Sequence, residues 1–377
     1  MALRALARVN LAAIERNVAR LRAGLSGGAG LAAVVKGNAY GHGPVPAARA
    51  ALAGGARSLA AATAGEASEL RAGGVEAPVL VMGALSDEEL RVALAAEAEV
   101  VAWNEPFVER VRAATAGSGG APVRVHVKLD TGMGRLGTRD FDEAIHVAEG
   151  IAASAPALEL AGAMTHFASA DEDPSFTALQ LARFGPFVSA MRERWPGLVV
   201  HAANSAATLR EPSSHFDLVR CGIAIYGCDP MNEDPAAHGL EPALELTSYV
   251  ADVKLARAGD SAGYGRRWVA SSETWVATVP IGYADGIRRA LTNNCDVLIG
   301  GRRYPLVGTV SMDNITVEVG VPDAVRRGDR VTLIGADGPE VQTAEDVARR
   351  IGTINYEILC GLTPRVPRVY HRDGTPA

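Results

Sequence analysis

The sequence is poor in cysteine and has no paired cysteine motif. Only four of its 377 residues are cysteines, namely Cys221, Cys228, Cys295 and Cys360. They lie far apart or in unlike contexts, and no Cys-x-x-Cys pair occurs. We therefore expect reduced, mostly buried thiols in place of disulfides or a metal site, as in a reducing compartment such as the cytoplasm.

The sequence also lacks long apolar runs and clusters of one charge. A membrane helix needs roughly 18 to 20 uninterrupted apolar residues, and the Ala-rich stretch 47–62 is broken by Gly, Arg and Ser. The first ten residues, MALRALARVN, contain no apolar core or small-residue cleavage site, so no secretory signal is expected. Because the net charge is -6 and Lys and Arg are scattered, neither a membrane nor a nucleic acid is an expected partner.

Short β-type runs recur through the first 225 residues and alternate with helical stretches. An open doubly wound sheet could show the same alternation, but eight units in this length favour a closed (β/α)8 barrel of the TIM type. The expected strands are Leu31–Lys36, Ser58–Thr63, Pro78–Gly83, Glu99–Trp103, Val123–Asp130, Leu158–His166, Leu198–Asn204 and Phe216–Gly222. The expected helices are Pro44–Leu52, Glu66–Ala72, Asp87–Ala96, Glu105–Ala116, Phe141–Ala153 and Phe176–Arg194.

The pattern changes after Gly227 to short Val/Ile/Thr-rich runs separated by Gly, Asp and Pro, which is typical of an antiparallel β domain. One helix, Thr343–Arg350, interrupts it, with Thr343 as N-cap and Asp346 in a capping-box position. We therefore predict an α/β protein whose residues 1–235 form the barrel and whose residues 236–377 form a mainly β domain, with 1–10 as a candidate strand of the second. The expected β segments are Ala243–Ala256, Val276–Ile281, Asp296–Ile299, Arg303–Val310, Ile315–Val319 and Arg330–Ile334.

Polar residues stand where the eight expected strands end. In a βα barrel the carboxyl ends of the strands form the active site. A lysine that ends the apolar strand LAAVV is partly desolvated, which lowers its pKa and favours Schiff-base chemistry. On these residues alone a Schiff-base aldolase and an enzyme using pyridoxal 5'-phosphate (PLP) are equally good interpretations. The residues in question are Lys36, Asp130, His166, Asn204, Ser205 and Arg220.

A candidate phosphate site lies at the end of the last strand. The turn Cys221-Gly222-Ile223 could direct backbone N–H groups at an anion, and Ser205 could add a hydroxyl donor. Most such glycines only make turns, so this signal is weak by itself.

The segment VVKGNAYGHG, from Val34 to Gly43, resembles the PLP-attachment motif of the alanine racemases. The resemblance continues in the family's order from about residue 5 to residue 370, so it covers both expected domains. The further matching motifs are HVKLDTGMGRLG (126–137), THF (165–167), HAANSA (201–206), VRCGIAIYG (219–227), GYG (263–265), IGYADG (281–286), VSMDN (310–314) and TINYEILC (353–360).

The resemblance implies a PLP-dependent racemase that interconverts L- and D-alanine and supplies D-alanine for cell-wall peptidoglycan. Lys36 would hold the cofactor and act as one base, and Tyr264 would act as the second base on the other face of the substrate's α-carbon. Tyr264 would need cationic neighbours to act as a base near neutral pH, and the family's Tyr-His-Arg set of Tyr264, His166 and Arg220 could provide them. In the family this tyrosine reaches the site from the other subunit, so the resemblance implies a homodimer with shared active sites.

The resemblance also assigns residues around the cofactor and the substrate. Arg220 would contact the pyridine nitrogen, oriented by His201, and because arginine keeps its proton the ring nitrogen would stay unprotonated and transamination would be disfavoured. The remaining cofactor-binding assignments are Tyr40, His166, Asn204, Ser205, Gly222, Ile223 and Tyr356.

Arg135 and Met312 match positions that bind the substrate carboxylate, Met312 through its backbone N–H, and Tyr283 and Tyr356 match the entry channel. Lys128 matches a lysine that is often carbamylated and then pairs with Arg135; carbamylated and unmodified forms stay open.

Three further residues lie outside the chemistry. Asp313 is expected to be structural, and Trp103 and Trp268 to be packing or surface residues. Ser311 stands where many members have cysteine, so thiol reactivity is absent there.

Rival interpretations remain. A non-catalytic, single-barrel PLP-binding protein would keep the lysine and the phosphate turn but lack the Tyr264 and Met312 motifs. A racemase of serine or basic amino acids stays open, because a hydrophobic pocket discriminates by only about 1–3 kcal/mol per methylene. A fold-related decarboxylase needs no tyrosine base, so the Tyr-His-Arg set counts against it.

Overall fold

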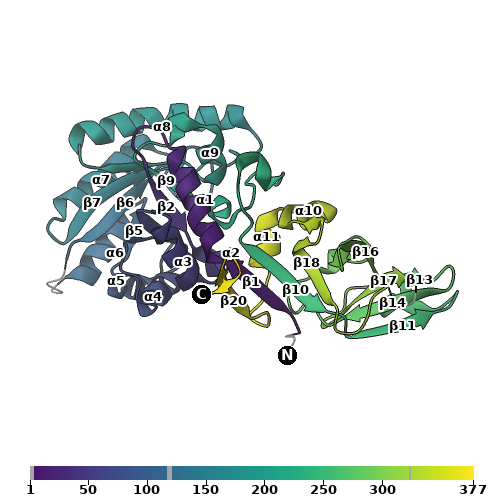
Figure 1. Cartoon of the computed structure of the whole chain (residues 1–377). Coiled ribbons are helices and arrows are strands. Elements are labelled where there is room, and N and C mark those ends of the chain that lie inside the picture. Colours follow the sequence, from purple (N-terminus) through teal and green to yellow (C-terminus); the bar gives the residue numbers. More distant parts are fainter. Residues whose placement is uncertain (1–3, 117–120, 322–323) are drawn as a thin grey trace. The chain divides into compact units, whose positions relative to one another are not determined.

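The computed structural model describes residues 4–116, 121–321 and 324–377 (Figure 1). The chain divides into two compact units. The first, called the barrel unit, contains Ile14–Ala39 and Pro44–Ile225; the second, called the sheet unit, contains Met1–Ala13, Tyr40–Gly43 and Tyr226–Ala377. Whether residues 1–235 and 236–377 behave as independent domains stays a prediction.

The barrel unit is a closed barrel of eight parallel strands that pair in chain order, and β2 closes it by pairing with β9. The expected fold class is thus confirmed, with strands one to four residues shorter than predicted because the polar ends turn into loops. The strands are β2 (Gly30–Val34), β3 (Ser58–Ala61), β4 (Val79–Val81), β5 (Glu99–Ala102), β6 (Val123–Lys128), β7 (Leu158–Met164), β8 (Val199–His201) and β9 (Leu218–Cys221).

Helices alternate with these strands, and several begin at capping residues that the sequence provides. Thr63 and Ser86 form capping boxes with Glu66 and Glu89, so backbone N–H groups that would otherwise lack partners are satisfied. The helices are α1 (Leu11–Ala23), α3 (Pro44–Ala53), α4 (Ala64–Ala72), α5 (Asp87–Ala95), α6 (Glu105–Thr115), α7 (Phe141–Ala153), α8 (Pro174–Arg194) and α9 (Ser205–Arg210).

Within the described residues the sheet unit is built on one large, mostly antiparallel sheet of 11 strands, in which β1 pairs antiparallel with β10 and parallel with β20. The strand order is β11-β14-β17-β16-β15-β18-β10-β1-β20-β21, with β19 paired to β18. The strands are β1 (Leu6–Asn10), β10 (Leu244–Tyr249), β11 (Asp252–Ala256), β14 (Thr274–Val279), β15 (Asp296–Ile299), β16 (Arg302–Val307), β17 (Ile315–Gly320), β18 (Arg330–Asp337), β19 (Glu340–Gln342), β20 (Arg368–Arg372) and β21 (Thr375–Pro376). A separate two-stranded pair consists of β12 (Ser261–Ala262) and β13 (Trp268–Val269).

Two details of the sheet unit compare directly with the sequence. Helix α10 (Ala344–Arg350) begins after Thr343 with the expected capping box to Asp346. The single segment expected at 243–256 was wrong, because it is two strands with different partners: β10 pairs with β18 and β11 pairs with β14. No Gly or Pro marks the break at 250–251, so the composition did not reveal it. A second helix, α11 (Asn355–Cys360), follows α10.

The remaining structural expectations concern packing. All four cysteines are thiols; Cys221, Cys228 and Cys295 are buried, as expected, and Cys360 is exposed. Trp103 packs against Leu80, Val101 and Met164, and Trp268 packs against a small core of the sheet unit, so both tryptophans are packing residues. No helix in the described part of the chain combines the length and apolarity that a membrane crossing requires.

Candidate active site

The carboxyl ends of the barrel strands bring together the polar side chains that the sequence singled out in the barrel unit. Lys36 follows β2, Lys128 ends β6, and Arg220 lies in β9, which pairs with β2. The charges of Arg220 and Lys36 both lower the pKa of Lys128, so the three side chains act on one another electrostatically. The barrel therefore concentrates positive charge at its mouth, as a site for an anionic ligand requires.

The backbone directly after Lys36 is in an unusual conformation. Gly37, Asn38, Ala39 and Tyr40, all within the short element α2 (Lys36–Tyr40), have φ values of 61°, 56°, 51° and 52°, in the left-handed region. Such a conformation costs roughly 1 kcal/mol or more per non-glycine residue. A run of this kind persists only where the surroundings impose it, and strained backbone of this type clusters at functional sites.

Arg220 is almost fully buried and is held by four acceptors. Its Nη2 donates to the carbonyl oxygens of Thr165 (2.9 Å) and Ala202 (3.0 Å) and to Nδ1 of His166 (3.1 Å), and its Nη1 donates to Nδ1 of His201 (2.9 Å). Burial lowers the pKa of Arg220 to about 10, so the guanidinium still carries its charge at neutral pH. The predicted roles of His166 and His201 beside Arg220 agree with this geometry.

Both imidazoles beside Arg220 are neutral. Burial, followed by the charge of Arg220, lowers the pKa of His166 and of His201 well below the usual value. Because a guanidinium can only donate, each ring must present an unprotonated Nδ1 to it and carry its hydrogen on Nε2. The site thus contains a fixed cation surrounded by uncharged acceptors.

Lys128 is a buried lysine with a weakened affinity for its proton. Burial, then the charges of Arg220 and Arg135, lower its pKa to about 8, although Asp130 acts in the opposite direction. An appreciable neutral fraction at physiological pH makes this amine nucleophilic, which is what carbamylation by carbon dioxide requires.

Asp130, which was expected at the barrel mouth, organises the loop that carries Arg135. Its Oδ1 accepts hydrogen bonds from the backbone N–H groups of Gly132, Met133 and Gly134 at 2.7–3.1 Å. Burial raises the pKa of Asp130, but these hydrogen bonds and that from Arg139 outweigh the effect and lower the pKa below its usual value. Asp130 therefore acts on the loop backbone as an anionic acceptor.

Two of the predicted phosphate residues, Ser205 and Gly222, meet at the end of β9. The Oγ of Ser205 accepts hydrogen bonds from the backbone N–H groups of Gly222 (2.9 Å) and Ala224 (3.4 Å), so its own hydroxyl hydrogen is left to donate to an anion. The side chain of Asn204 accepts from the N–H of Ala207 (3.0 Å) and thereby caps α9. Asn204 thus shapes the turn that presents Ser205.

In the sheet unit, the predicted residues Tyr264, Tyr283 and Met312 lie on segments that hydrogen bonds join. Thr309 Oγ1 donates to the carbonyl oxygen of Tyr264 (2.6 Å), and the N–H of Tyr283 donates to that of Ser311 (3.0 Å). All three predicted side chains are exposed, and Tyr264 is the most exposed at 74%. Large side chains exposed on neighbouring segments are candidates for burial against another surface.

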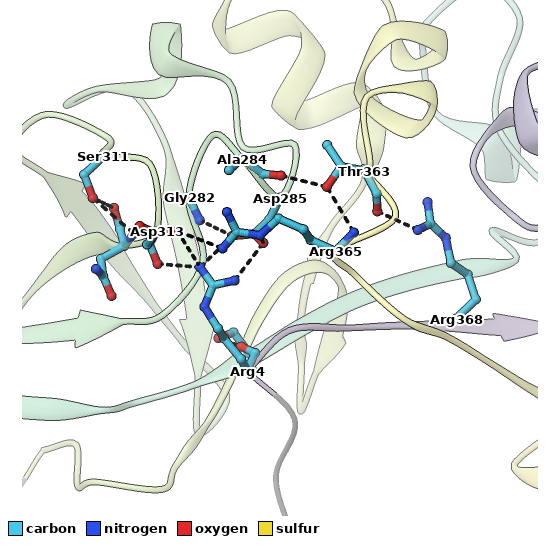
Figure 2. A network of polar contacts seen from close by, with 11 residues as sticks. Arg4, Gly282, Ala284, Asp285, Ser311, Asp313, Thr363, Arg365 and Arg368 are labelled. Carbon is cyan, nitrogen blue, oxygen red and sulfur yellow. Dashed lines mark hydrogen bonds and ion pairs between the residues drawn. The ribbon is translucent and has the colours of Figure 1, made fainter.

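A buried carboxylate fixes these segments (Figure 2). Asp285, whose side chain is fully buried, accepts two hydrogen bonds from the guanidinium of Arg4 (2.8 and 2.9 Å) and one from the N–H of Gly282 (2.8 Å). Arg4 and Arg365 also contact Asp313, through its carbonyl oxygen (2.9 Å) and its carboxylate (2.7 Å) respectively. This network supports a structural role for Asp313 and holds the turn that carries Tyr283.

Tyr40 and Tyr356, both predicted to bind the phosphate, lie together in the sheet unit with their ring centroids 5.9 Å apart. Tyr226 lies between Tyr40 and His42, at 5.1 Å and 4.4 Å from their rings. Sequence reasoning did not single out Tyr226 or His42, although both lie in the matching motifs.

Glu99 and His126 were also missed. His126 is buried and its Nδ1 lies 2.9 Å from Nε2 of His201, while its Nε2 lies 2.7 Å from Glu99. The available signal was the run Arg124, His126 and Lys128 in the β6 sequence VRVHVK. Alternate polar residues in a barrel strand that should be apolar share one face.

Two family models cover nearly the whole chain. The model described as "Alanine racemase, N-terminal domain" matches residues 9–230, and that described as "Alanine racemase, C-terminal domain" matches residues 243–370. The chain belongs to the alanine racemase family. A curated relative named alanine racemase from Geobacillus kaustophilus (strain HTA426) is 42% identical over 370 residues, which are 97% of this chain and 94% of that protein. One from Frankia casuarinae is 43% identical over 98% of this chain and 96% of the relative.

Solved structures of alanine racemases have the same fold. The alanine racemase from D-cycloserine-producing Streptomyces lavendulae matches with a TM-score of 0.92 and 39% identity, covering 98% of each chain. The Bacillus anthracis alanine racemase with bound L-Ala-P matches with a TM-score of 0.91 and 39% identity, covering 99% of this chain and 96% of that one. Barrel and sheet unit together therefore correspond to nearly the whole of these two solved chains.

Proposed function

We propose that this alanine racemase family member interconverts L- and D-alanine with pyridoxal 5'-phosphate held by Lys36, and so supplies D-alanine for peptidoglycan. The observation that carries the proposal is the buried guanidinium of Arg220 at the mouth of a barrel that also contains Lys36. The full-length similarity to alanine racemases favours this activity over a single-barrel PLP-binding protein, because both domain models match. We propose the cytoplasm as its location, which the four thiols support.

The donor set fits pyridoxal 5'-phosphate. The amine of Lys36 can bind its aldehyde covalently, and the Ser205 hydroxyl can donate to its phosphate. Among the described residues, Nη1 of Arg220 donates to His201 alone, so its second N–H can meet the pyridine nitrogen, which accepts a hydrogen bond. When bound, this cofactor withdraws electrons from the substrate's α-carbon and so makes its proton removable.

The two faces of the α-carbon require two groups that exchange protons. Lys36 takes or returns the proton on one face, and Tyr264 does so on the other; each must lie within about 3 Å of that proton in the reacting complex. The exposure of Tyr264 supports its contribution to the site of another subunit. We therefore propose a homodimer in which each site combines Lys36 of one subunit with Tyr264 of its partner.

The charge of Arg220 limits the reaction to racemisation. Because Arg220 donates and cannot accept a proton at neutral pH, it would leave the ring nitrogen of a bound cofactor unprotonated and so a weaker electron acceptor. Arg220 would thereby disfavour proton delivery to the wrong carbon, and with it transamination. The neutral His166, which accepts from Arg220, completes the Tyr-His-Arg set with the proposed base Tyr264.

The remaining residues are proposed to bind and orient. Arg135 and the backbone N–H of Met312 would hold the substrate carboxylate. Lys128, with its weakened proton affinity, would fix Arg135 once carbamylated and otherwise stay an unmodified lysine beside it. The other proposed roles are phosphate binding by Tyr40, Ser205, Gly222, Ile223 and Tyr356, and shaping of the adjacent turn by Asn204. Tyr283 and Tyr356 would line the entrance, and Asp313 would have a structural role.

A panel of L-amino acids tests this function. The protein, loaded with pyridoxal 5'-phosphate, is incubated with L-alanine, L-serine and L-lysine, and each product is resolved by chiral chromatography. D-Alanine should form well ahead of D-serine and D-lysine. Equal rates would replace the proposal with a broad-specificity racemase, and carbon dioxide release without any D-amino acid would replace it with a decarboxylase.

A further inference from the structure

A row of hydrogen bonds runs through the barrel unit from Arg220 to a carboxylate that the predicted site does not include. Nη1 of Arg220 lies 2.9 Å from Nδ1 of His201, Nε2 of His201 lies 2.9 Å from Nδ1 of His126, and Nε2 of His126 lies 2.7 Å from Glu99. Beyond Glu99 the guanidinium of Arg124 binds its other carboxylate oxygen at 2.8 Å. The strands β9, β8, β6 and β5 each contribute one of the first four residues.

The two ends of this row have fixed hydrogen-bonding roles. Arg220 can only donate, because a guanidinium has no acceptor. Glu99 can only accept, because it is ionised: burial raises its pKa, but the hydrogen bonds from His126 and Arg124 and the charge of Arg124 outweigh this effect and lower the pKa below its usual value. Every bond in the row must therefore point from Arg220 toward Glu99.

The direction of the bonds assigns the tautomers of both rings. Since Nδ1 of His201 accepts from Arg220, a neutral His201 carries its hydrogen on Nε2 and donates it to Nδ1 of His126. His126 then carries its own hydrogen on Nε2, where it donates to Glu99. If Glu99 were removed, the Nε2–H of His126 would lose its acceptor in a buried place, and the opposite tautomer would break the bond from His201.

The row also links the buried charge of Arg220 to an anion. Among the described residues, the hydrogen-bond partners of Arg220 are two carbonyl oxygens and two neutral imidazoles, and none is a carboxylate. Aligned hydrogen bonds polarise one another, so the negative charge of Glu99 strengthens the acceptor that His201 offers to Arg220.

We propose that Glu99 and His126 are positioning residues that hold His201 in a single tautomer and, through it, fix the orientation of the Arg220 guanidinium. This proposal rests on the proposed function only in that Arg220 is taken to face the pyridine nitrogen of the cofactor. Neither Glu99 nor His126 touches substrate or cofactor in this role. In His–carboxylate pairs generally, the hydrogen bond that one ring nitrogen makes determines which of the two nitrogens carries the hydrogen.

The test compares variants that differ in the hydrogen-bond acceptor facing Nε2 of His126. Glu99→Leu removes the acceptor, whereas Glu99→Gln keeps an oxygen that can accept from Nε2 of His126 and is the conservative rescue. His126→Phe removes the next member of the row. Glu159→Leu is the matched control, because Glu159 is the other carboxylate that binds Arg124, whereas the hydrogen bonds of the His126 side chain among the described residues go to His201 and Glu99.

The main readout is the ¹⁵N NMR spectrum of the imidazoles in full-length protein, with and without pyridoxal 5'-phosphate. The eight histidines can be assigned by single substitutions. In the unsubstituted protein, His126 and His201 should both be neutral with hydrogen on Nε2. Glu99→Leu and His126→Phe should mix the tautomers of His201, while Glu99→Gln and Glu159→Leu should leave them unchanged.

The second readout is the rate of alanine racemisation by the loaded protein. Glu99→Leu should lower kcat about 10- to 100-fold, the usual cost of losing a partner that orients a functional side chain, with little change in KM. Glu99→Gln should recover most of the rate, and Glu159→Leu should match the unsubstituted protein.

Three results would overturn the proposal: His201 with hydrogen on Nδ1, His201 doubly protonated at neutral pH, or tautomers that Glu99→Leu and His126→Phe leave unchanged. The first two results can be obtained with the unsubstituted protein, so the proposal can be overturned even if a variant fails to fold. If the tautomers behave as expected but no D-alanine forms, the proposed function fails and the positioning role stands.

Discussion

Arg220 in the barrel unit and Tyr264 in the sheet unit have opposite surroundings. Arg220 is 3% exposed and meets four acceptors from its own unit, whereas Tyr264 is 74% exposed and its carbonyl oxygen accepts a hydrogen bond from Thr309. The barrel therefore contains a preorganised electrostatic site, because every group that orients Arg220 is already in place. The sheet unit exposes the side chains of Tyr264, Tyr283 and Met312, for which we propose a surface of another subunit as the partner.

The difference separates the part of the proposed site that the barrel unit already surrounds from the part that the sheet unit exposes. Arg220 and Lys36 both belong to the barrel unit, so the proposed contacts to the cofactor's ring and aldehyde come from that unit. In the proposed mechanism, proton exchange on the second face of the α-carbon depends on Tyr264, whose side chain is exposed on the sheet unit. Four experiments test this comparison.

The largest effect is expected from Lys36→Ala, because it removes both the cofactor anchor and one base. Racemisation should fall by more than about 10³-fold, since a positioned acid or base alone contributes about 10²–10⁴. Borohydride treatment of the loaded protein should fix the cofactor to Lys36, as mass spectrometry of peptides will show. Lys254→Ala, at an exposed lysine, is the control. A label on Lys128 would show that the anchor was assigned to the wrong lysine.

Mixing two inactive variants tests whether the two units work across subunits. Lys36→Ala and Tyr264→Phe should each lose about 10²-fold or more of the rate. After subunit exchange, the heterodimer has one doubly defective site and one intact site, so activity should return to about half per heterodimer. Mixing Lys36→Ala with the double variant should restore nothing. If exchange is confirmed by mass and no activity returns, both bases come from the same chain.

Arg220→Glu tests the electronic role of the barrel cation. A carboxyl group can protonate the ring nitrogen or share its proton, so racemisation should fall about 10²- to 10³-fold, the usual cost of one preorganised electrostatic donor. Pyruvate should form by transamination and a long-wavelength absorption should appear during turnover. Arg220→Lys keeps the charge and should add no pyruvate. Reduced activity in Arg220→Glu without either change would mean that Arg220 only positions the cofactor.

The smallest effect is expected from Arg4→Ala in the sheet unit. It leaves the buried Asp285 with Arg365 at 3.3 Å and the Gly282 N–H as its remaining partners. The free energy of unfolding should fall by about 1–2 kcal/mol, less than for a fully buried pair because Arg4 is one-third exposed. Urea unfolding measures this, and Arg8→Ala, which removes a more exposed ion pair, should cost less than about 0.5 kcal/mol. Equal losses would show that Asp285 does not depend on Arg4.

The sequence predicted most of the fold and the type of site. The eight β-then-α units were correctly placed because parallel barrel strands are continuous apolar runs that end at polar residues. It failed at 243–256, where one apolar segment serves two strands with different partners and the composition contains no signal for the change. The strands were predicted too long, because the identity of a polar residue at a strand end does not show whether its backbone still pairs with the neighbouring strand or already belongs to the loop.

By itself, the sequence determined the family and the barrel, because these depend on local patterns and on motifs that stay together along the chain; the roles of Lys36 and Arg220 stay predictions from the same motifs. The tertiary structure alone decided how the charge of Arg220 is held. Glu99 and Arg220 are 121 positions apart, and only closure of the barrel aligns the two imidazoles between them. Hydrogen-bond direction and burial are properties of neighbours in space, so no local pattern in the chain could specify them.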